Sequence, residues 1–168
     1  KSTPGAEGLI TIPFFTGERT PNLPNAKACL LGLDDQNTGT NNILRSAVEG
    51  VTYGLKYGLG RLADNSVRAE KIILTGGGAK SDAWRQIVAD ICDAPVEMHK
   101  QEEGAAFGAA LQALAMLEET ELTSLVKEHL DRDSTRCCEP DPSTVTFYDE
   151  AYFQYRQSVE QIASIYGN

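Results

Sequence analysis

The sequence lacks both a long apolar run and an excess of positive charge. No apolar stretch approaches the ~20 residues that a membrane-spanning helix needs, and the first residues do not have the regions of a signal peptide. Lysine and arginine together number 15 against 24 aspartates and glutamates, so that the formal net charge is −9. Nucleic acids and anionic membranes attract concentrated positive charge, and the composition therefore argues against either partner.

Cysteine is scarce, and its spacing provides neither a metal site nor a disulfide framework. The four cysteines are Cys29, Cys92, Cys137 and Cys138. They include no C-x-x-C pair, and adjacent cysteines rarely bridge one another without strain. His99 and His129 stand apart without flanking ligands, so we expect no metal ion held by them. A reducing cytoplasm is the simplest location for such a chain.

The chain is organised around residues 71–92, which read KIILTGGGAKSDAWRQIVADIC. A short apolar run predicts a buried strand, three consecutive glycines predict a turn, and apolar residues at helical spacing predict a helix with Ser81 as its N-cap. Such a turn can present bare backbone to a nucleotide, because glycine lets a ligand come close. Glycines that serve only the geometry of the turn are an equally good interpretation.

The glycine turn is not a phosphate-binding loop of a known pattern. It lacks both G-x-x-x-x-G-K-[ST] and G-x-G-x-x-G. Asp82 would also repel a polyphosphate at the helix N-terminus. A ribose or an adenine base is therefore the better ligand for this turn.

The remaining apolar patterns predict further elements. Short strands are expected at 9–15, 29–33 and 96–99, and helices at 43–63, 104–119, 120–130 and along the C-terminal tail. Helix and strand alternate around the glycine turn, which implies an α/β fold with parallel pairing and right-handed crossovers. Ligands of such sheets bind beyond the carboxyl ends of the strands, where both Gly76–Gly78 and Glu103 would lie.

Two helices have distinctive stripes. In the helix at 43–63 the apolar stripe comprises Leu44, Val48, Val51, Leu55, Leu59 and Leu62, and beside it lie Gly50, Gly54 and Gly58. We expect this helix to be deeply packed, with its glycines close to another backbone; Glu49 is either a buried charge partner or solvated. Tyrosines at helical spacing in the tail predict a packing seam rather than a base-stacking surface, and the seam could serve a dimer as well as a core.

A loop containing two prolines, at 16–28, follows the first predicted strand. Loops of this length inside a compact domain are often functional. Glu18 and Arg19 in this loop fit either a solvated ion pair or the lining of a cleft, and the sequence leaves both interpretations open.

Three segments together resemble the C-terminal domain of the FGGY family of carbohydrate kinases, with the xylulose kinases most similar. The segments are PFFTGERTP at 13–21 with the following CLLGL, GGGAKSDAWRQIVADI at 76–91, and EEGAAFGAA at 102–110. The resemblance implies a ribonuclease-H-like, actin-like ATPase fold. It also implies transfer of the ATP γ-phosphate to a sugar hydroxyl with Mg²⁺, D-xylulose giving D-xylulose 5-phosphate as the first choice.

The resemblance also implies a set of site residues. Gly77, Gly78 and Asp82 match the family's adenosine-binding signature, and Ala79 and Ser81 belong to the same turn. Asp82 could accept a hydrogen bond from a ribose hydroxyl or the adenine amine. A second signature, matched by Glu103 and Gly108, is expected to support the turn, and Glu18 and Arg19 lie in a loop on the cleft side of the family's fold.

On this resemblance, residues 1–168 are the nucleotide-binding part of a kinase whose N-terminal domain, first strands and catalytic aspartate lie upstream. No catalytic residue is expected in the chain, which should expose apolar surface and bind the remainder of the same polypeptide. Kinases of glycerol, ribulose or gluconate are alternatives. So are a non-catalytic actin-like nucleotide-binding module and an α/β domain whose glycine turn binds nothing.

Overall fold

A computed structural model describes residues 2–101 and 104–166. The chain divides into two compact units. The first contains the residues up to Ala69, Asp90–Asp93 and the residues from Pro140 onward, and the second contains Glu70–Ala89 and Ala94–Glu139. Among the described residues, no helix combines the length and apolarity that crossing a membrane requires.

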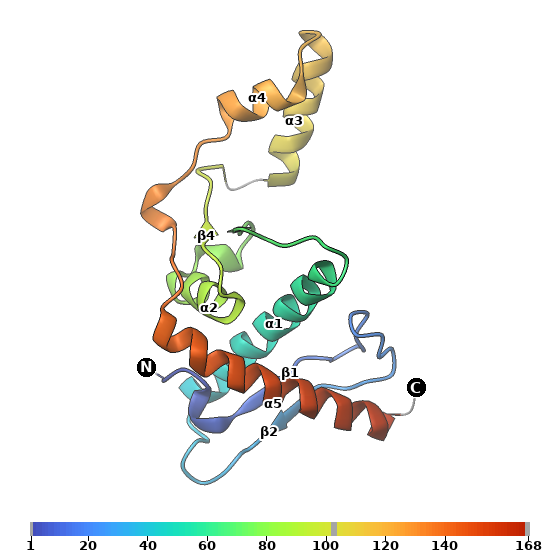
Figure 1. Ribbon diagram of the computed structural model, residues 1–168, viewed down its shortest axis with the longest axis vertical. Helices are drawn as coiled ribbons and strands as arrows, with labels where there is room; N and C mark the ends of the chain where they lie inside the picture. Colours follow the sequence, from blue (N-terminus) through green and yellow to red (C-terminus); the bar gives the residue numbers. More distant parts are fainter. Residues whose placement is uncertain (1, 102–103, 167–168) are drawn as a thin grey trace. The chain divides into compact units, whose positions relative to one another are not determined.

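The first unit is built on an antiparallel strand pair, β1 (Ile10–Ile12) and β2 (Cys29–Leu31). Two long helices, α1 (Thr40–Ala63) and α5 (Pro142–Tyr166), both contact β1 and each other (Figure 1). A 3-10 helix at Ala6–Gly8 also contacts α1. The predicted strands and helices of this unit are confirmed, with β1 ending immediately before Pro13, which cannot donate to a ladder.

Four of the six residues in the apolar stripe predicted to bury α1 face outward instead, and the other two, Val48 and Leu59, are half-buried. Leu44, Val51, Leu55 and Leu62 are exposed, whereas the buried residues of α1 are Ser46, Glu49, Gly50, Thr52 and Tyr53. Small and hydrogen-bonding side chains occupy this inner face because β1 approaches closely and a polar network forms there. The expectation of exposed apolar surface on the chain is thereby confirmed.

Of the three α1 glycines beside the apolar stripe, Gly50 alone lies against another backbone among the described residues. A Cβ atom at Gly50 would overlap the carbonyl oxygen of Thr11 in β1, so that close approach is confirmed at this position. At Gly54 and Gly58 no other part of the described chain lies within 4 Å of where a Cβ would stand, so no second backbone approaches them among the described residues.

Glu49 is a buried charge partner, which resolves the alternatives that the sequence left open. Its Oε1 accepts hydrogen bonds from Arg45 Nε at 2.7 Å, from the hydroxyl of Tyr148 at 2.6 Å and from the backbone N–H of Gly5 at 3.0 Å. Arg45 also donates to Tyr148 Oη at 2.9 Å. The network ties the N-terminal segment, α1 and α5 together, and it keeps the buried carboxylate hydrogen-bonded.

The tyrosine stripe of α5 is a packing seam, as predicted. Tyr148, Tyr155, Val159 and Ile162 are buried, and the ring of Tyr53 on α1 lies 5.0 Å from that of Tyr155, measured between centroids. Aromatic pairs at this separation stabilise a contact beyond their buried area. The seam holds α1 and α5 together.

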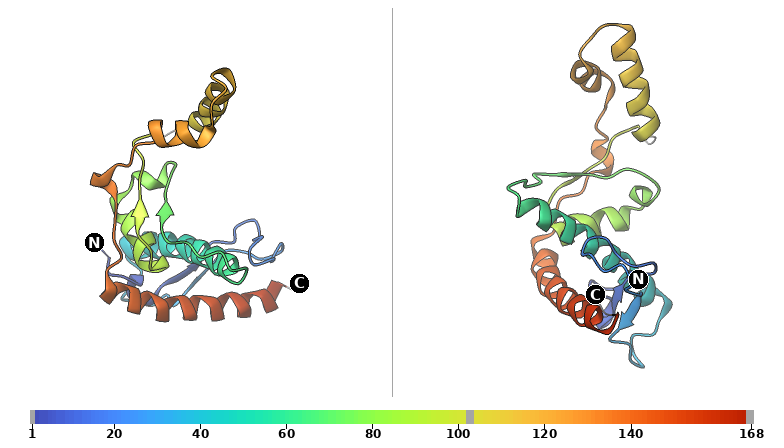
Figure 2. Two further views of the ribbon diagram at one scale, coloured as in Figure 1. Left: turned by 45° about the horizontal axis from the view of Figure 1, so that its top comes forward. Right: turned by 90° about the vertical axis from the view of Figure 1, so that its right-hand side faces the viewer.

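The second unit contains a parallel strand pair, β3 (Ile72–Ile73) and β4 (Val96–Glu97), in which Ile72 pairs with Val96. The predicted parallel pairing is therefore confirmed. Between the strands runs α2 (Asp82–Cys92), whose last residues belong to the first unit. After β4 come α3 (Gly104–Leu117), α4 (Leu122–His129) and a 3-10 helix at Ser134–Arg136 (Figure 2).

Candidate functional site: the glycine turn after β3

The three consecutive glycines of the turn have different surroundings. Gly76 has a φ of +88°, a left-handed conformation that other residues rarely adopt. A Cβ at Gly78 would overlap the Trp84 ring. Gly77 has ordinary helical angles, φ −60° and ψ −41°, and no atom lies within 4 Å of its Cβ position. The chain itself thus requires glycine at positions 76 and 78, but not at 77.

The backbone of Gly77 is also open to a hydrogen-bond partner. Its carbonyl accepts from Lys80 N at 3.2 Å, whereas among the described residues its N–H group has no hydrogen-bond acceptor. Gly77 lies immediately before a short 3-10 helix at Gly78–Lys80, which precedes α2, so its N–H group points to no carbonyl of a preceding helical turn. Gly77 therefore offers both space and a donor to a ligand.

Arg85, which the sequence reasoning missed, clamps the turn to α2. Its Nη1 donates to the carbonyl oxygen of Ala79 at 2.7 Å, and its Nη2 lies 2.5 Å from Asp82 Oδ1. Its side chain is buried, whereas that of Asp82 is 92% exposed. The guanidinium offsets the negative charge of Asp82, so this carboxylate repels a nearby phosphate group less than an unpaired one would. An arginine three residues after the acidic helix start is the signal that could have revealed the pair.

The predicted site residues have distinct positions in this turn. Ala79 is buried and faces the protein interior. Ser81 caps α2, as predicted, because its Oγ accepts the N–H of Trp84 at 3.3 Å. Gly77 and Asp82 are left as the two predicted residues open to a ligand.

The second signature is only partly described. Glu103 lies outside the described residues. Gly108 lies within α3 with nothing within 4 Å of its Cβ position. At the start of α3, a Cβ on Gly104 would stand 3.2 Å from Thr75 Oγ1, so the small residues of this helix do let it approach the turn.

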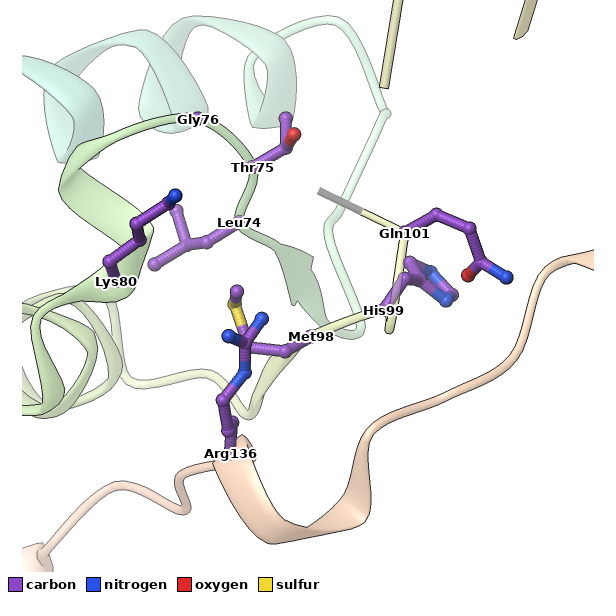
Figure 3. Close-up of a pocket in the computed structure, with 8 residues that line it drawn as sticks. All are labelled: Leu74, Thr75, Gly76, Lys80, Met98, His99, Gln101 and Arg136. Atoms are coloured by element: carbon purple, nitrogen blue, oxygen red, sulfur yellow. The ribbon is translucent and has the colours of Figure 1, made fainter. Parts of the chain in front are cut away.

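A small pocket lies beside the turn, between the ends of β3 and β4 (Figure 3). Its volume of about 10 Å³ suits one water molecule rather than a nucleoside. His99 Nδ1 lies 3.3 Å from the carbonyl oxygen of Asp131, and Gln101 Nε2 donates to that of His129 at 2.7 Å. This leaves His99 Nε2 and Gln101 Oε1 buried without a hydrogen-bond partner among the described residues. With His99 Nδ1 donating, both atoms are acceptors, and a donor in this pocket would satisfy them.

The loop of Glu18 and Arg19 belongs to the first unit and is shaped by its own hydrogen bonds. Glu18 Oε1 accepts hydrogen bonds from the backbone N–H groups of Arg19 at 2.7 Å and Thr20 at 3.2 Å.

Among residues 2–101 and 104–166, no group of three or more histidine, cysteine, aspartate or glutamate side chains could hold a metal ion.

Comparison with known proteins identifies the class of this α/β chain. The model of the FGGY family of carbohydrate kinases, C-terminal domain, matches residues 1–117. The chain belongs to this family, whose members have the ribonuclease-H-like, actin-like ATPase fold that the resemblance implied.

Among individual relatives, the chain is 40% identical over 158 residues to the xylulose kinase of Haemophilus influenzae, a match that covers 94% of the chain and 32% of that protein. It is 36% identical over 126 residues to the xylulose kinase of Escherichia coli, covering 73% of the chain and 26% of that protein. The chain thus spans a third or less of the curated relatives that it matches.

Solved structures have the same fold. The ligand-bound xylulose kinase of Lactobacillus acidophilus superposes with a TM-score of 0.88 at 26% identity, covering 99% of the chain and 34% of that protein. A glycerol kinase of Plasmodium falciparum, solved with ADP, superposes with a TM-score of 0.78 at 20% identity over 94% of the chain and 31% of that protein, which shows the fold alone.

Proposed function

We propose that the chain is the ATP-binding part of a sugar kinase and that the nucleoside end of ATP lies on the turn around Gly77. The observation that carries the proposal is the surroundings of Gly77. Among the described residues, no contact requires glycine at this position and no acceptor binds its N–H group. A nucleotide resting there would receive a hydrogen bond from the backbone N–H group of Gly77, in the turn that precedes α2.

The neighbouring residues have separable roles in this proposal. The outward carboxylate of Asp82 accepts a hydrogen bond from a ribose hydroxyl or from the adenine amine. Arg85 holds Ala79 and Asp82 in place, and Ser81 fixes the start of α2. Mg²⁺ would accompany the ATP phosphates. Mg²⁺ usually binds to substrate phosphates and one or two carboxylates, so we assign it to the nucleotide and to the rest of the kinase.

For the sugar, we propose D-xylulose, phosphorylated to D-xylulose 5-phosphate by the complete kinase in the cytoplasm. The 40% identity to a xylulose kinase supports this substrate, and the four free cysteines agree with a reducing compartment. Gluconate is the second candidate, since a gluconate kinase of Lactobacillus acidophilus superposes with a TM-score of 0.87 at 26% identity. No catalytic residue is assigned to this chain.

Calorimetric titration with ATP and with ADP tests the nucleotide site. Gly77→Val should lower the affinity by at least about tenfold, because the isopropyl group fills the ligand's space and costs more than about 1.4 kcal/mol of binding energy. The unfolding temperature should stay unchanged, since the site is open and φ is ordinary.

Gly60→Val is the matched control, because Gly60 is exposed on α1 and also has nothing within 4 Å. It should leave nucleotide affinity as in the parent chain. Equal affinities for the parent chain and Gly77→Val would remove the nucleotide from this turn.

A further inference from the structure

A groove of about 450 Å³ runs along the outward face of α1 in the first unit. Its lining includes Val51, Gly54, Leu55 and Gly58 from α1, together with Glu18 and Tyr155. Val51 and Leu55 are 46% and 44% exposed, and the same stripe continues to Leu44 and Leu62, which are more exposed still. Exposed apolar residues in one continuous stripe mark a contact surface.

Gly54 and Gly58 form the part of the groove where another backbone could come closest. Each glycine in a helix interior costs ~1 kcal/mol relative to alanine, and nothing within 4 Å explains either of them among the described residues. Their spacing of four residues places them on one side of α1, next to Val51 and Leu55. This arrangement suits a second helix packed closely against α1.

Tyr155 supplies an independent sign that something occupies the groove. The residue is 2% exposed and lines the groove, yet its hydroxyl has no hydrogen-bond partner among the described residues. A buried hydroxyl without a partner is costly, because it has lost its hydrogen bonds to water. An occupant with a polar side chain at this point would restore the missing bond.

We propose that this groove receives an α-helix from the part of the kinase polypeptide that the chain does not include, with one polar side chain hydrogen-bonded to Tyr155. This inference rests on the proposed function, because it requires a longer kinase. The stretch that matches this chain makes up 32% of the Haemophilus influenzae xylulose kinase. The remaining two thirds of such a protein leave ample sequence for this helix. The stripe at steps of four and three residues is the pattern of helix–helix packing.

The test compares the isolated chain with a chimera in which it replaces the matched stretch of the Haemophilus influenzae xylulose kinase. In the isolated chain, Gly58→Leu and Gly60→Leu should both raise the unfolding temperature or leave it unchanged, since both positions are open. In the chimera, Gly58→Leu should lower that temperature by several degrees, whereas Gly60→Leu, on the other side of α1, should not. Equal behaviour of the two variants in the chimera would overturn the proposal, as would a chimera that does not fold.

Tyr155→Phe provides a second readout with the opposite sign in the two contexts. It should leave the isolated chain equally or more stable, because it removes an unpaired hydroxyl, and it should destabilise the chimera. A stabilised chimera would contradict the proposed hydrogen bond.

A dimer of the isolated chain in sedimentation, abolished by Gly58→Leu but not by Gly60→Leu, would overturn the proposal and assign the groove to a second copy instead. Nucleotide affinity is measured in a separate experiment. If Gly77→Val leaves that affinity unchanged while the groove variants behave as expected, only the proposed nucleotide site is refuted.

Discussion

Gly77 and Gly78 are adjacent in the sequence, but the packing of the folded chain requires glycine only at the second of these two positions. The ring of Trp84 lies where a side chain at Gly78 would stand, so this glycine is needed for packing between the turn and α2. Gly77 has no such neighbour and ordinary dihedral angles. The difference means that only Gly77 can report on a ligand without disturbing the fold.

Substitution of Gly78 by alanine should therefore destabilise the chain. The added methyl group would displace Trp84, and such overpacking costs roughly 1–3 kcal/mol of the free energy of unfolding. Denaturant unfolding monitored by the fluorescence of Trp84, the only tryptophan in the sequence, measures this loss. Gly77→Ala is the control and should be nearly neutral. If both variants unfold at the same denaturant concentration as the parent, Trp84 does not pack against Gly78.

At the scale of elements, the seam between α1 and α5 buries titratable side chains. Burial, together with the carboxylate of Glu49, raises the pKa of both Tyr53 and Tyr148 above the ordinary tyrosine value. Burial and the charge of Glu18 raise the pKa of Tyr155 in the same way. The folded state thus favours the neutral phenol at all three positions.

These raised values predict a loss of stability at alkaline pH. Free tyrosine ionises near pH 10, so the contribution of each buried phenol is complete below about pH 10 and falls as the pH rises toward its folded-state pKa. Ultraviolet titration should show tyrosinate appearing in two stages, the second coinciding with loss of helical circular dichroism. A single stage near pH 10 with the helices intact would contradict the burial of these rings.

How far the sequence predicted each element depended on whether the determining contacts were local. Ser81 capping α2 and the parallel pairing of β3 with β4 follow from local spacing and order, and both were predicted correctly. The stripe of α1 was correctly identified as apolar, but periodicity does not say what covers it. Its polar inner face depends on Glu49 meeting Arg45 and Tyr148, the latter 99 residues away in the chain.

The candidate site shows the same limit. The glycine triplet was evident from the sequence, but the separate roles of its members depend on the position of Trp84 and on the dihedral angles of the turn. The clamp by Arg85 was missed because it joins Ala79 and Asp82 only after the 3-10 helix at Gly78–Lys80 and α2 have formed.

For the molecule as a whole, the role that we propose for this chain is nucleotide positioning rather than bond-making. Phosphoryl transfer needs positioning of both substrates, neutralisation of developing charge and a group that accepts the hydroxyl proton. The chain has a glycine turn, which we propose binds the nucleotide, and an open groove, and it covers 32% of the Haemophilus influenzae xylulose kinase. We therefore regard catalysis as a property of the longer kinase.

The isolated chain should accordingly show no ATP-dependent phosphorylation of D-xylulose. An assay of ADP release in the presence of D-xylulose and Mg²⁺ measures this, with the Haemophilus influenzae xylulose kinase as the active control. Turnover above the background of heat-denatured chain would mean that catalytic residues lie within these 168 residues.

We propose that ATP rests on the backbone around Gly77, and amide chemical shifts in a nuclear magnetic resonance titration report on each backbone N–H group of this turn. Addition of ADP to the labelled chain should shift the N–H resonances of Gly76, Gly77 and Asp82 in a saturable way, while those of Gly54 and Gly58 remain in place. A saturable titration that leaves the glycine turn unmoved and shifts resonances elsewhere would contradict the account.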